Sequence, residues 1–213
     1  MVILIGNQKG GVGKSTLALL LGNYLTQIRG RKVTIVDMDY QQSLYTKSQK
    51  ARILENAPFY QIIPSDLKSF PSLLRALDPG PDELVLIDLP GKMGDDGLLP
   101  LFAAADVVLC PFSYDEFSID STVLFAMVLR KINERSPLIF IPNRIKSTVK
   151  YETRNQVEKV MQHFGVLSPA LADRIDFQRI STFRTPLILY PLVLPMLELV
   201  YGQYLQWQGN GQE

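Results

Sequence analysis

The feature that most constrains this chain is the glycine-rich run Asn-Gln-Lys-Gly-Gly-Val-Gly-Lys-Ser-Thr at residues 7–16. An apolar run at 2–5 precedes it and predicts a buried strand, whereas the segment from Lys14 onward carries apolar residues on one helical face. In such a strand-to-helix turn, glycines let backbone N–H groups close around phosphate oxygens, with the positive end of the helix behind them. The run therefore predicts a phosphate-binding loop formed by Gly10, Gly11, Val12, Gly13, Lys14, Ser15 and Thr16.

Two side chains of this loop carry the expected chemistry. Lys14 would reach the β and γ phosphates of a nucleotide, and the Ser15 hydroxyl would bind Mg²⁺. The strict motif has a glycine where this chain has Gln8, and a tight turn without a ligand is the alternative interpretation. The spacing of Gly13, Lys14 and Ser15 favours a phosphate site.

A second lysine, Lys9, gives the run Lys-Gly-Gly-Val-Gly-Lys-Ser-Thr, which resembles the deviant Walker A motif of the ParA/MinD family of partitioning ATPases. The resemblance extends from Met1 to about Pro191. It implies that ATP and Mg²⁺ are the ligands, and that Lys9 reaches across an ATP-bound homodimer to the phosphates held by the other subunit. By this resemblance the catalytic residues are Lys9, Lys14 and Asp39.

Two carboxylates, Asp37 and Asp39, follow the apolar residues at 33–36. Side chains alternate along a strand, so the two project to the same side, at the edge where an open α/β sheet binds its ligand. The segment resembles the second Asp-x-Asp motif of the same family, with Tyr40 in place of the usual proline. The resemblance implies that Asp39 positions the attacking water and that Asp37 supports the Mg²⁺ through water. Two acids in a solvated turn are the alternative.

A third motif, Leu-Val-Leu-Ile-Asp at residues 84–88, ends on a carboxylate. A carboxylate directly after buried apolar residues needs a cation or hydrogen-bond donors, and Mg²⁺ with its retained waters would provide the partner. Asp88 therefore resembles a Walker B residue that binds the metal through water. The glycine-rich residues 90–97 have the composition of a switch loop that responds to the γ phosphate, or of an ordinary surface loop.

The pattern of the whole chain predicts an α/β fold. Short apolar runs alternate with segments long enough for crossover helices, which favours a doubly wound, mostly parallel sheet flanked by helices, of the P-loop NTPase, deviant Walker A class. With 213 residues and 46% hydrophobic content, a single domain over 1–213 is the simplest expectation. The expected strands are 2–5, 32–37, 59–63, 84–88, 106–111 and 138–142, and the helices after the first are 41–56, 67–77, 119–133 and 151–164.

Asn143 and Arg144 follow the apolar run at 138–142 and resemble the family segment that recognises adenine. An asparagine amide can donate and accept at a base edge, and an arginine can stack on the base plane. Either residue could equally form a turn at the strand end.

Cysteine content and the apolar segments exclude several classes. The single cysteine, Cys110, allows no internal disulfide and cannot supply the two ligands per subunit of the similar nitrogenase iron proteins. A secretory signal is not expected, because the loop follows the first apolar run at once. We expect 186–201 to be too interrupted by Pro191, Pro195 and Glu198 for a membrane span, and the protein to be cytoplasmic.

The charge of the chain is uneven. The net charge is +1, yet residues 144–184 carry eight basic and four acidic residues. In a dimer, two such regions would bind DNA phosphates without reading sequence, whereas solvated helical faces are the alternative. The candidate DNA-contacting residues are Lys146, Lys150, Arg154, Arg179 and Arg184.

Three functional classes stay open. The first is a DNA-segregation ATPase whose ATP dimer coats the nucleoid and is released when a ParB-like or cargo adaptor protein triggers hydrolysis. The second is a MinD-like membrane-surface ATPase, which would need a basic amphipathic helix near the carboxyl terminus, whereas no Lys or Arg follows Arg184. The third is a metabolic or assembly relative with the same nucleotide motifs. The charge distribution favours the first.

Overall fold

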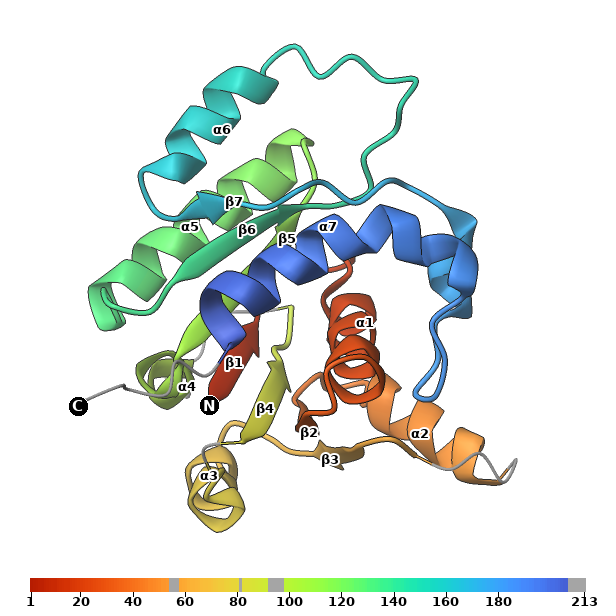
Figure 1. Ribbon diagram of the computed structural model, residues 1–213. Coiled ribbons are helices and arrows are strands. Elements are labelled where there is room, and N and C mark those ends of the chain that lie inside the picture. The colour runs from red at the N-terminus through yellow and green to blue at the C-terminus, as the bar shows by residue number, and fades with distance from the viewer. Residues whose placement is uncertain (54–57, 81, 92–97, 207–213) are drawn as a thin grey trace, which may run out of the picture.

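The computed structural model describes residues 1–53, 58–80, 82–91 and 98–206. In these ranges seven strands, all paired in parallel, form one sheet in the order β3-β2-β4-β1-β5-β6-β7. Helices cover both faces of this sheet (Figure 1), so the predicted doubly wound α/β class is confirmed. The strands are β1 (Val2–Ile5), β2 (Lys32–Asp37), β3 (Gln61–Pro64), β4 (Glu83–Asp88), β5 (Val107–Phe112), β6 (Leu138–Pro142) and β7 (Val166–Leu167). The helices are α1 (Lys14–Gln27), α2 (Ser43–Ile53), α3 (Phe70–Leu77), α4 (Leu99–Ala104), α5 (Glu116–Ile132), α6 (Arg154–Gln162) and α7 (Tyr190–Val200), with short helical turns η2 (Ile175–Arg179), η3 (Leu187–Leu189) and η4 (Tyr201–Leu205).

Alternating side chains divide the core into two layers. Ile3 and Ile5 of β1 pack into the cluster that contains residues of α1 and α7, whereas Val2 and Leu4 pack into the cluster that contains residues of α4, α5 and α6. All four side chains are buried. Because helices cover both faces of a parallel sheet, its strands are mostly apolar, which makes them visible in the sequence as short apolar runs.

The strand register brings the candidate site together. β4 lies between β1 and β2, and Asp88 at its end is in register with Ile5 of β1 and with Asp37 of β2. The phosphate loop leaves β1 directly after Ile5, so both carboxylates lie beside it. This is the carboxyl edge of the sheet, where open α/β sheets bind their ligands.

The predicted elements are present, three strands with the predicted ends and the others with shifted ends. α5 begins at Glu116, earlier than predicted, because Asp115 caps it by accepting a hydrogen bond from the Ser118 N–H at 3.0 Å. β7 and α4 have no counterpart among the predicted elements, since each is too short to show a clear period. The predicted helix 41–56 ends outside the described residues, which contain α2 as Ser43–Ile53.

The carboxyl-terminal helix corrects a further expectation. Leu187–Leu205 is helical throughout, and by length and composition alone this helix could cross a membrane. Pro191 lies in the first turn of α7, where its missing N–H is not needed, and Pro195 is accommodated within the helix. The prolines therefore do not interrupt the segment as expected. One face of it is buried in the same cluster as α1, through Val193, Leu197 and Val200 among others.

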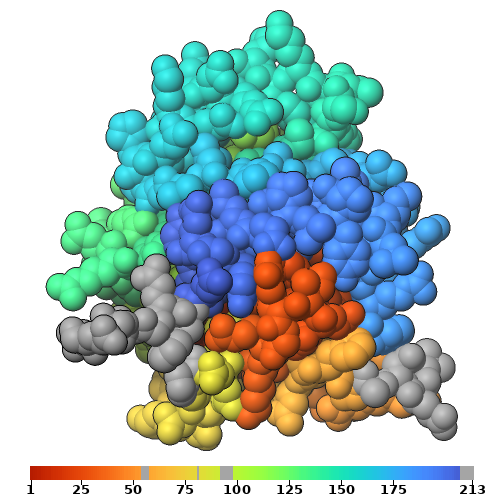
Figure 2. Space-filling model, viewed as in Figure 1, coloured from red at the N-terminus to blue at the C-terminus, as the bar shows by residue number. Residues whose placement is uncertain are grey.

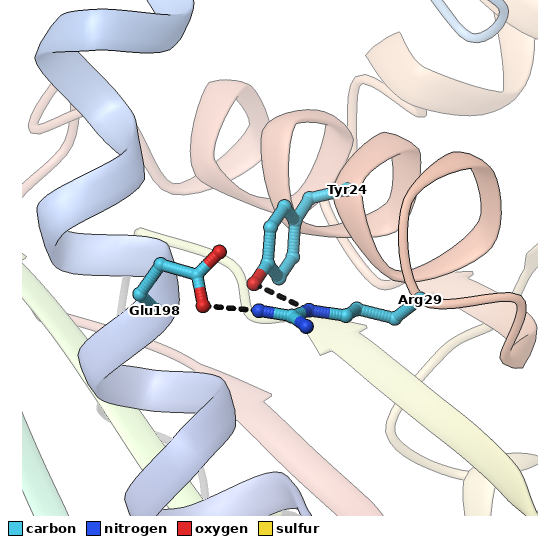
Figure 3. Close-up of polar contacts among 3 residues, drawn as sticks. All are labelled: Tyr24, Arg29 and Glu198. Atoms are coloured by element: carbon cyan, nitrogen blue, oxygen red, sulfur yellow. Dashed lines mark hydrogen bonds and ion pairs between the residues drawn. The ribbon is translucent and has the colours of Figure 1, made fainter.

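A cluster around Arg29 ties this helix to α1 (Figure 3). The Arg29 guanidinium donates to the Tyr24 hydroxyl at 2.7 Å and forms an ion pair with Glu198 of α7. It also lies over the rings of Tyr24 and Tyr201, 5.2 and 4.4 Å from their centroids. Burial raises the pKa of Tyr24 to about 12, so its phenol stays neutral at physiological pH. We call Tyr24, Arg29, Glu198 and Tyr201 the α1–α7 clamp.

Candidate nucleotide site

The phosphate loop has the backbone that its glycines predict. Gly11 and Gly13 have φ values of 78° and 97°, in the left-handed region that glycine adopts without strain. A β-carbon at Gly13 would lie 2.4 Å from Asn143 Nδ2, so this position has no room for a side chain. The same Asn143 nitrogen donates to the Val12 carbonyl at 2.7 Å. The end of β6 is thereby joined to the loop.

Lys14 is the buried cation of the loop. It is 6% exposed, and its Nζ donates to the Lys9 carbonyl at 3.2 Å. Burial lowers the pKa of the Lys14 ammonium, and the carboxylates of Asp88 and Asp39 act in the opposite direction. A cation in this position, at the positive end of α1, fits the phosphates of a nucleotide.

Asp88 is a carboxylate without a partner. It is fully buried, and neither of its oxygens accepts a hydrogen bond from any residue that the structure describes. Burial raises the pKa of Asp88 to about 7; the nearby Ser15 hydroxyl, which does not meet hydrogen-bond geometry, and the Lys14 ammonium oppose this shift. A buried polar group left without a partner indicates a ligand that supplies one.

Ser15 and Asp88 fit the Mg²⁺ that the sequence predicts. This ion prefers oxygen ligands and keeps several of its waters, and a hydroxyl beside an unpartnered carboxylate offers such oxygens. Within residues 1–53, 58–80, 82–91 and 98–206, no group of three or more His, Cys, Asp or Glu side chains could hold a metal. Binding here would therefore depend on the Ser15 hydroxyl, water and phosphate oxygens as well as on Asp88.

Asp37 and Asp39 have different surroundings. Asp37 is fully buried, and its Oδ2 accepts hydrogen bonds from the N–H groups of Leu44 and Tyr45 in the first turn of α2, at 3.0 and 2.9 Å. Burial raises the pKa of Asp37, while these backbone hydrogen bonds oppose the shift. Asp39 is half-buried and lines the pocket beside the phosphate loop. Asp37 thus anchors α2, and Asp39 faces the space next to the loop.

Two adjoining pockets form one groove along the loop. A pocket of about 240 Å³ is lined by loop residues together with Asp39 and Gly91. A second pocket of about 120 Å³ shares Gly13, Thr16 and Arg144 with it. The first pocket lies against the phosphate loop, and the second extends from it toward residues 172–178. The remaining residues that line the second pocket are Asn143, Ala172, Asp173, Arg174, Phe177 and Gln178.

Residues 172–178 are site candidates that the sequence analysis missed. They reach the groove because Ala172 pairs in parallel with Ile145, and the Asp173 N–H donates to the Ile145 carbonyl at 3.0 Å. This pairing is an isolated bridge after the short β7, and such a bridge leaves no apolar period in the sequence. The local excess of basic residues was the one signal in this stretch.

The structure brings Asn143 and Arg144 to the groove in different ways. The Asn143 amide is engaged at both ends, since its Nδ2 donates to Val12 and its Oδ1 accepts from the Arg144 N–H at 2.9 Å. Arg144 is exposed, has a φ of 58° and lines both pockets. Asn143 therefore supports the loop, while Arg144 lines both pockets of the groove.

The predicted switch loop at 90–97 lies mostly outside the described residues, which include only Pro90 and Gly91 of it. Gly91 packs against the phosphate loop: a β-carbon there would lie 3.3 Å from Gly10 Cα and 3.7 Å from Lys14 Nζ. The chain after β4 thus starts at the edge of the phosphate pocket.

The predicted DNA-contacting residues are all exposed but differ in pairing. Arg154 forms an ion pair with Glu158 at 2.8 Å, and Arg179 forms one with Asp176 at 3.7 Å. Segments 144–154 and 174–184 occupy the upper and right-hand parts of the view in Figure 2, in teal and light blue. The residues that form no ion pair with any described residue are Lys146, Lys150 and Arg184.

The structure has the features of a P-loop nucleotide-binding protein. These are a parallel α/β sheet, a phosphate loop between β1 and α1, and a carboxylate at the end of the neighbouring strand. The chain belongs to the CobQ/CobB/MinD/ParA nucleotide binding domain family, whose sequence profile matches residues 3–187. The resemblance to ParA/MinD proteins is thereby confirmed.

Several similar proteins are named as partitioning proteins. Chromosome partitioning protein ParA of Caulobacter vibrioides is 27% identical, covering 90% of this chain and 87% of its own. Chromosome-partitioning ATPase Soj of Treponema pallidum is 26% identical, covering 75% of this chain and 77% of its own. The structure of a Cyanothece McdA–ATP complex has a TM-score of 0.73 at 18% identity, covering 94% of this chain and 95% of its own. The last comparison is a likeness of fold.

Proposed function

We propose that this protein is a Mg²⁺-dependent ATPase that dimerises with ATP, binds DNA without sequence preference and partitions DNA or another cargo. The observation that carries the proposal is the placement of two lysines: Lys14 is buried in the phosphate pocket, whereas Lys9 is not among the residues lining it. A loop lysine outside its own nucleotide pocket is available to a second copy. The names of the Caulobacter and Treponema relatives support the same activity.

The residues of the groove suit phosphoryl transfer to water. Lys14 would stabilise charge on the transferring group, and Asp39, at the edge of the phosphate pocket, would orient the attacking water. When bound beside Ser15 and Asp88, Mg²⁺ would neutralise phosphate charge. Because the second cation, the partner subunit's Lys9, arrives only with dimerisation, turnover by the isolated chain would be slow and open to stimulation by a ParB-like or cargo adaptor protein.

The second pocket would take the base and ribose of ATP. Arg144 offers a guanidinium plane on which a base can stack, and Phe177 lines the same pocket. Asn143 contributes by holding the loop rather than by a free amide, because both of its ends are already bound. The ATP in the similar McdA structure supports the choice of nucleotide.

The DNA surface would centre on Lys146, Lys150 and Arg184, which form no ion pair with a carboxylate in the described part of the chain. One subunit offers few phosphate contacts, whereas a dimer doubles them and steepens the dependence on salt. Arg154 and Arg179 would contribute less, because each already faces a carboxylate. The protein would then be cytoplasmic and would lie on nucleoid DNA while ATP is bound.

One observation favours a second candidate, a membrane-surface ATPase of MinD type. The helix Leu187–Leu205 is long and apolar enough to span a membrane by length and composition. One of its faces is packed against α1, and residues 185–213 contain no Lys or Arg that could attract anionic lipid. We therefore propose DNA binding rather than membrane binding as the function of this protein.

A mobility-shift series tests the proposal. The wild type should bind a random-sequence duplex with ATP and not without it, and binding should weaken steeply as salt rises. The combined variant Lys146→Gln, Lys150→Gln, Arg184→Gln should lose at least about tenfold in DNA affinity and keep ATP affinity. The matched variant Arg154→Gln, Arg179→Gln should lose less. Binding to anionic vesicles but not to DNA would favour the membrane candidate, and binding to neither would favour a metabolic or assembly relative.

A further inference from the structure

Phe117 is a large apolar side chain on the surface beside the phosphate loop. It is 73% exposed and lies in the first turn of α5. A single exposed ring is common on protein surfaces and indicates nothing alone. Phe117 also contacts the phosphate loop, and this contact suggests a specific role for the ring.

That contact is made by Lys9. The Lys9 Nζ lies 5.4 Å from the centroid of the Phe117 ring, within the range of a cation–π interaction. Glu116 and Asp120 flank Phe117 on α5, yet Lys9 forms no ion pair with them or with any other described carboxylate. The ammonium is therefore held by an aromatic ring, which leaves its charge free for a stronger anion.

The backbone of Lys9 is tied to the same helix. The Lys9 N–H donates to Asn7 Oδ1 at 2.9 Å, and Asn7 Nδ2 donates to the Thr122 hydroxyl of α5 at 2.8 Å and to the Pro111 carbonyl at 2.9 Å. Asn7 and Thr122 are fully buried. The Asp115 cap fixes the first turn of α5 as well. The main chain of Lys9 is thus linked to α5 through Asn7, and its side chain contacts a ring of the same helix.

We propose that Phe117 is a positioning residue for Lys9, and that a second copy of this chain covers the Phe117 ring in the ATP-bound dimer. The inference rests on the proposed ATP-dependent dimer and names a residue outside the phosphate loop on which that dimer depends. A free lysine side chain has many rotamers, and restricting them before association reduces the entropy lost on binding. The ring holds the ammonium at the edge of its own loop, ready for the phosphates of the partner. Covering the pair excludes water and strengthens the cation–π contact.

The test measures dimerisation of the full chain with a slowly hydrolysed ATP analogue, by sedimentation equilibrium. Phe117→Leu keeps an apolar side chain and removes the ring, and it should raise the dimer dissociation constant about five- to thirtyfold, because a twofold-symmetric dimer contains the contact twice. Phe117→Trp should restore dimerisation. Nucleotide affinity, titrated at concentrations where the chain is monomeric, should not change. The matched control is Leu124→Ala, an exposed apolar residue two turns further along α5.

A double-mutant cycle with Lys9→Ala separates positioning from general surface effects. The dissociation constants are measured at protein concentrations high enough to populate the weakened Lys9→Ala dimer. There Phe117→Leu should have no further effect, since the ring acts through Lys9. Equal dimerisation of Phe117→Leu and wild type overturns the inference and leaves the proposed function standing. An equally large loss in Leu124→Ala, or an undiminished Phe117→Leu effect without Lys9, overturns it too. A wild type that stays monomeric with the analogue overturns the proposed function itself, and this inference with it.

Discussion

The glycines of the phosphate loop form one motif in the sequence, but the backbone does not require glycine equally at each of these positions. Gly13 combines a φ of 97° with a neighbouring Asn143 nitrogen that a β-carbon would meet at 2.4 Å. Gly10 has no atom within 4 Å of the place where its β-carbon would be. The backbone therefore demands glycine at one position and tolerates a small side chain at the other.

Gly13→Ala should consequently lower the free energy of unfolding by about 1–3 kcal/mol and abolish nucleotide binding, because both strain and a steric clash act there. Gly10→Ala is the matched control and should change stability by less than about 0.5 kcal/mol. Urea denaturation and nucleotide titration measure the two effects. Equal stability of the two variants would show that the loop geometry is not as described.

Asp88 makes stability depend on pH in the absence of Mg²⁺ and nucleotide. Its pKa is raised from 3.8 to about 7, so between these values the folded chain keeps a proton that the unfolded chain has lost. Stability contributed by this group is present at low pH and is lost as the pH rises to about 7. Asp88→Asn removes the titration, so it should be about 4 kcal/mol more stable than wild type at pH 8 and nearly equal at pH 4.

Urea denaturation of the two chains at both pH values checks this. Asp37, whose pKa burial also raises, titrates in both chains, and its repulsion with Asp88 is part of the measured difference. A stability difference that is the same at pH 4 and pH 8 would contradict the assignment of the buried charge.

Strands were predictable from the sequence where both faces of the sheet are covered by helices, because such strands consist of a continuous run of apolar residues. β1, β2 and β6 begin and end where predicted, because their residues are apolar and their ends carry the loop and Asp37 or Asn143. β7, with two residues, and the bridge at Ala172 arise from tertiary pairing with β6 and the chain after it, which no local period records. The phosphate end of the groove was accordingly predicted, whereas its other end was missed except for Asn143 and Arg144.

The α1–α7 clamp gives a prediction at the scale of elements. Arg29→Ala removes a hydrogen bond, an ion pair and two ring contacts, and should lower the free energy of unfolding by about 1–2 kcal/mol. Lys32→Ala is the control, because its ion pair with Glu83 is a surface pair from a side chain that is 76% exposed, and it should cost less than about 0.5 kcal/mol. Chemical denaturation compares them. A smaller effect of Arg29→Ala than of the control would exclude the clamp as a stabilising contact.

At the scale of the whole molecule, substitutions of Lys9 and Asp39 should both preserve ATP binding but should have different effects on dimerisation. Lys9→Ala should keep measurable ATP binding, because Lys14 remains in the pocket, and should lose dimerisation and hydrolysis together. Asp39→Ala should bind ATP and accumulate as the dimer, because the attacking water would no longer be oriented and ATP would not be hydrolysed. Light scattering on a sizing column, with ATP, distinguishes a persistent dimer from a monomer. A Lys9→Ala protein that dimerises and hydrolyses like the wild type would refute the role given to this lysine.

The α1–α7 clamp also sets an order of events during synthesis. Arg29 and Glu198 are 169 positions apart in the chain. At a translation rate of about 5–20 residues per second, Glu198 is made roughly ten to thirty seconds after Arg29. Until then the apolar side of α1 that α7 covers stays open to water, although the phosphate loop, β1 and α1 have long left the peptidyl-transferase centre. Newly synthesised chains of this protein therefore depend on α7 to cover this side of α1, and a chain truncated before α7 is expected to expose an apolar, aggregation-prone face.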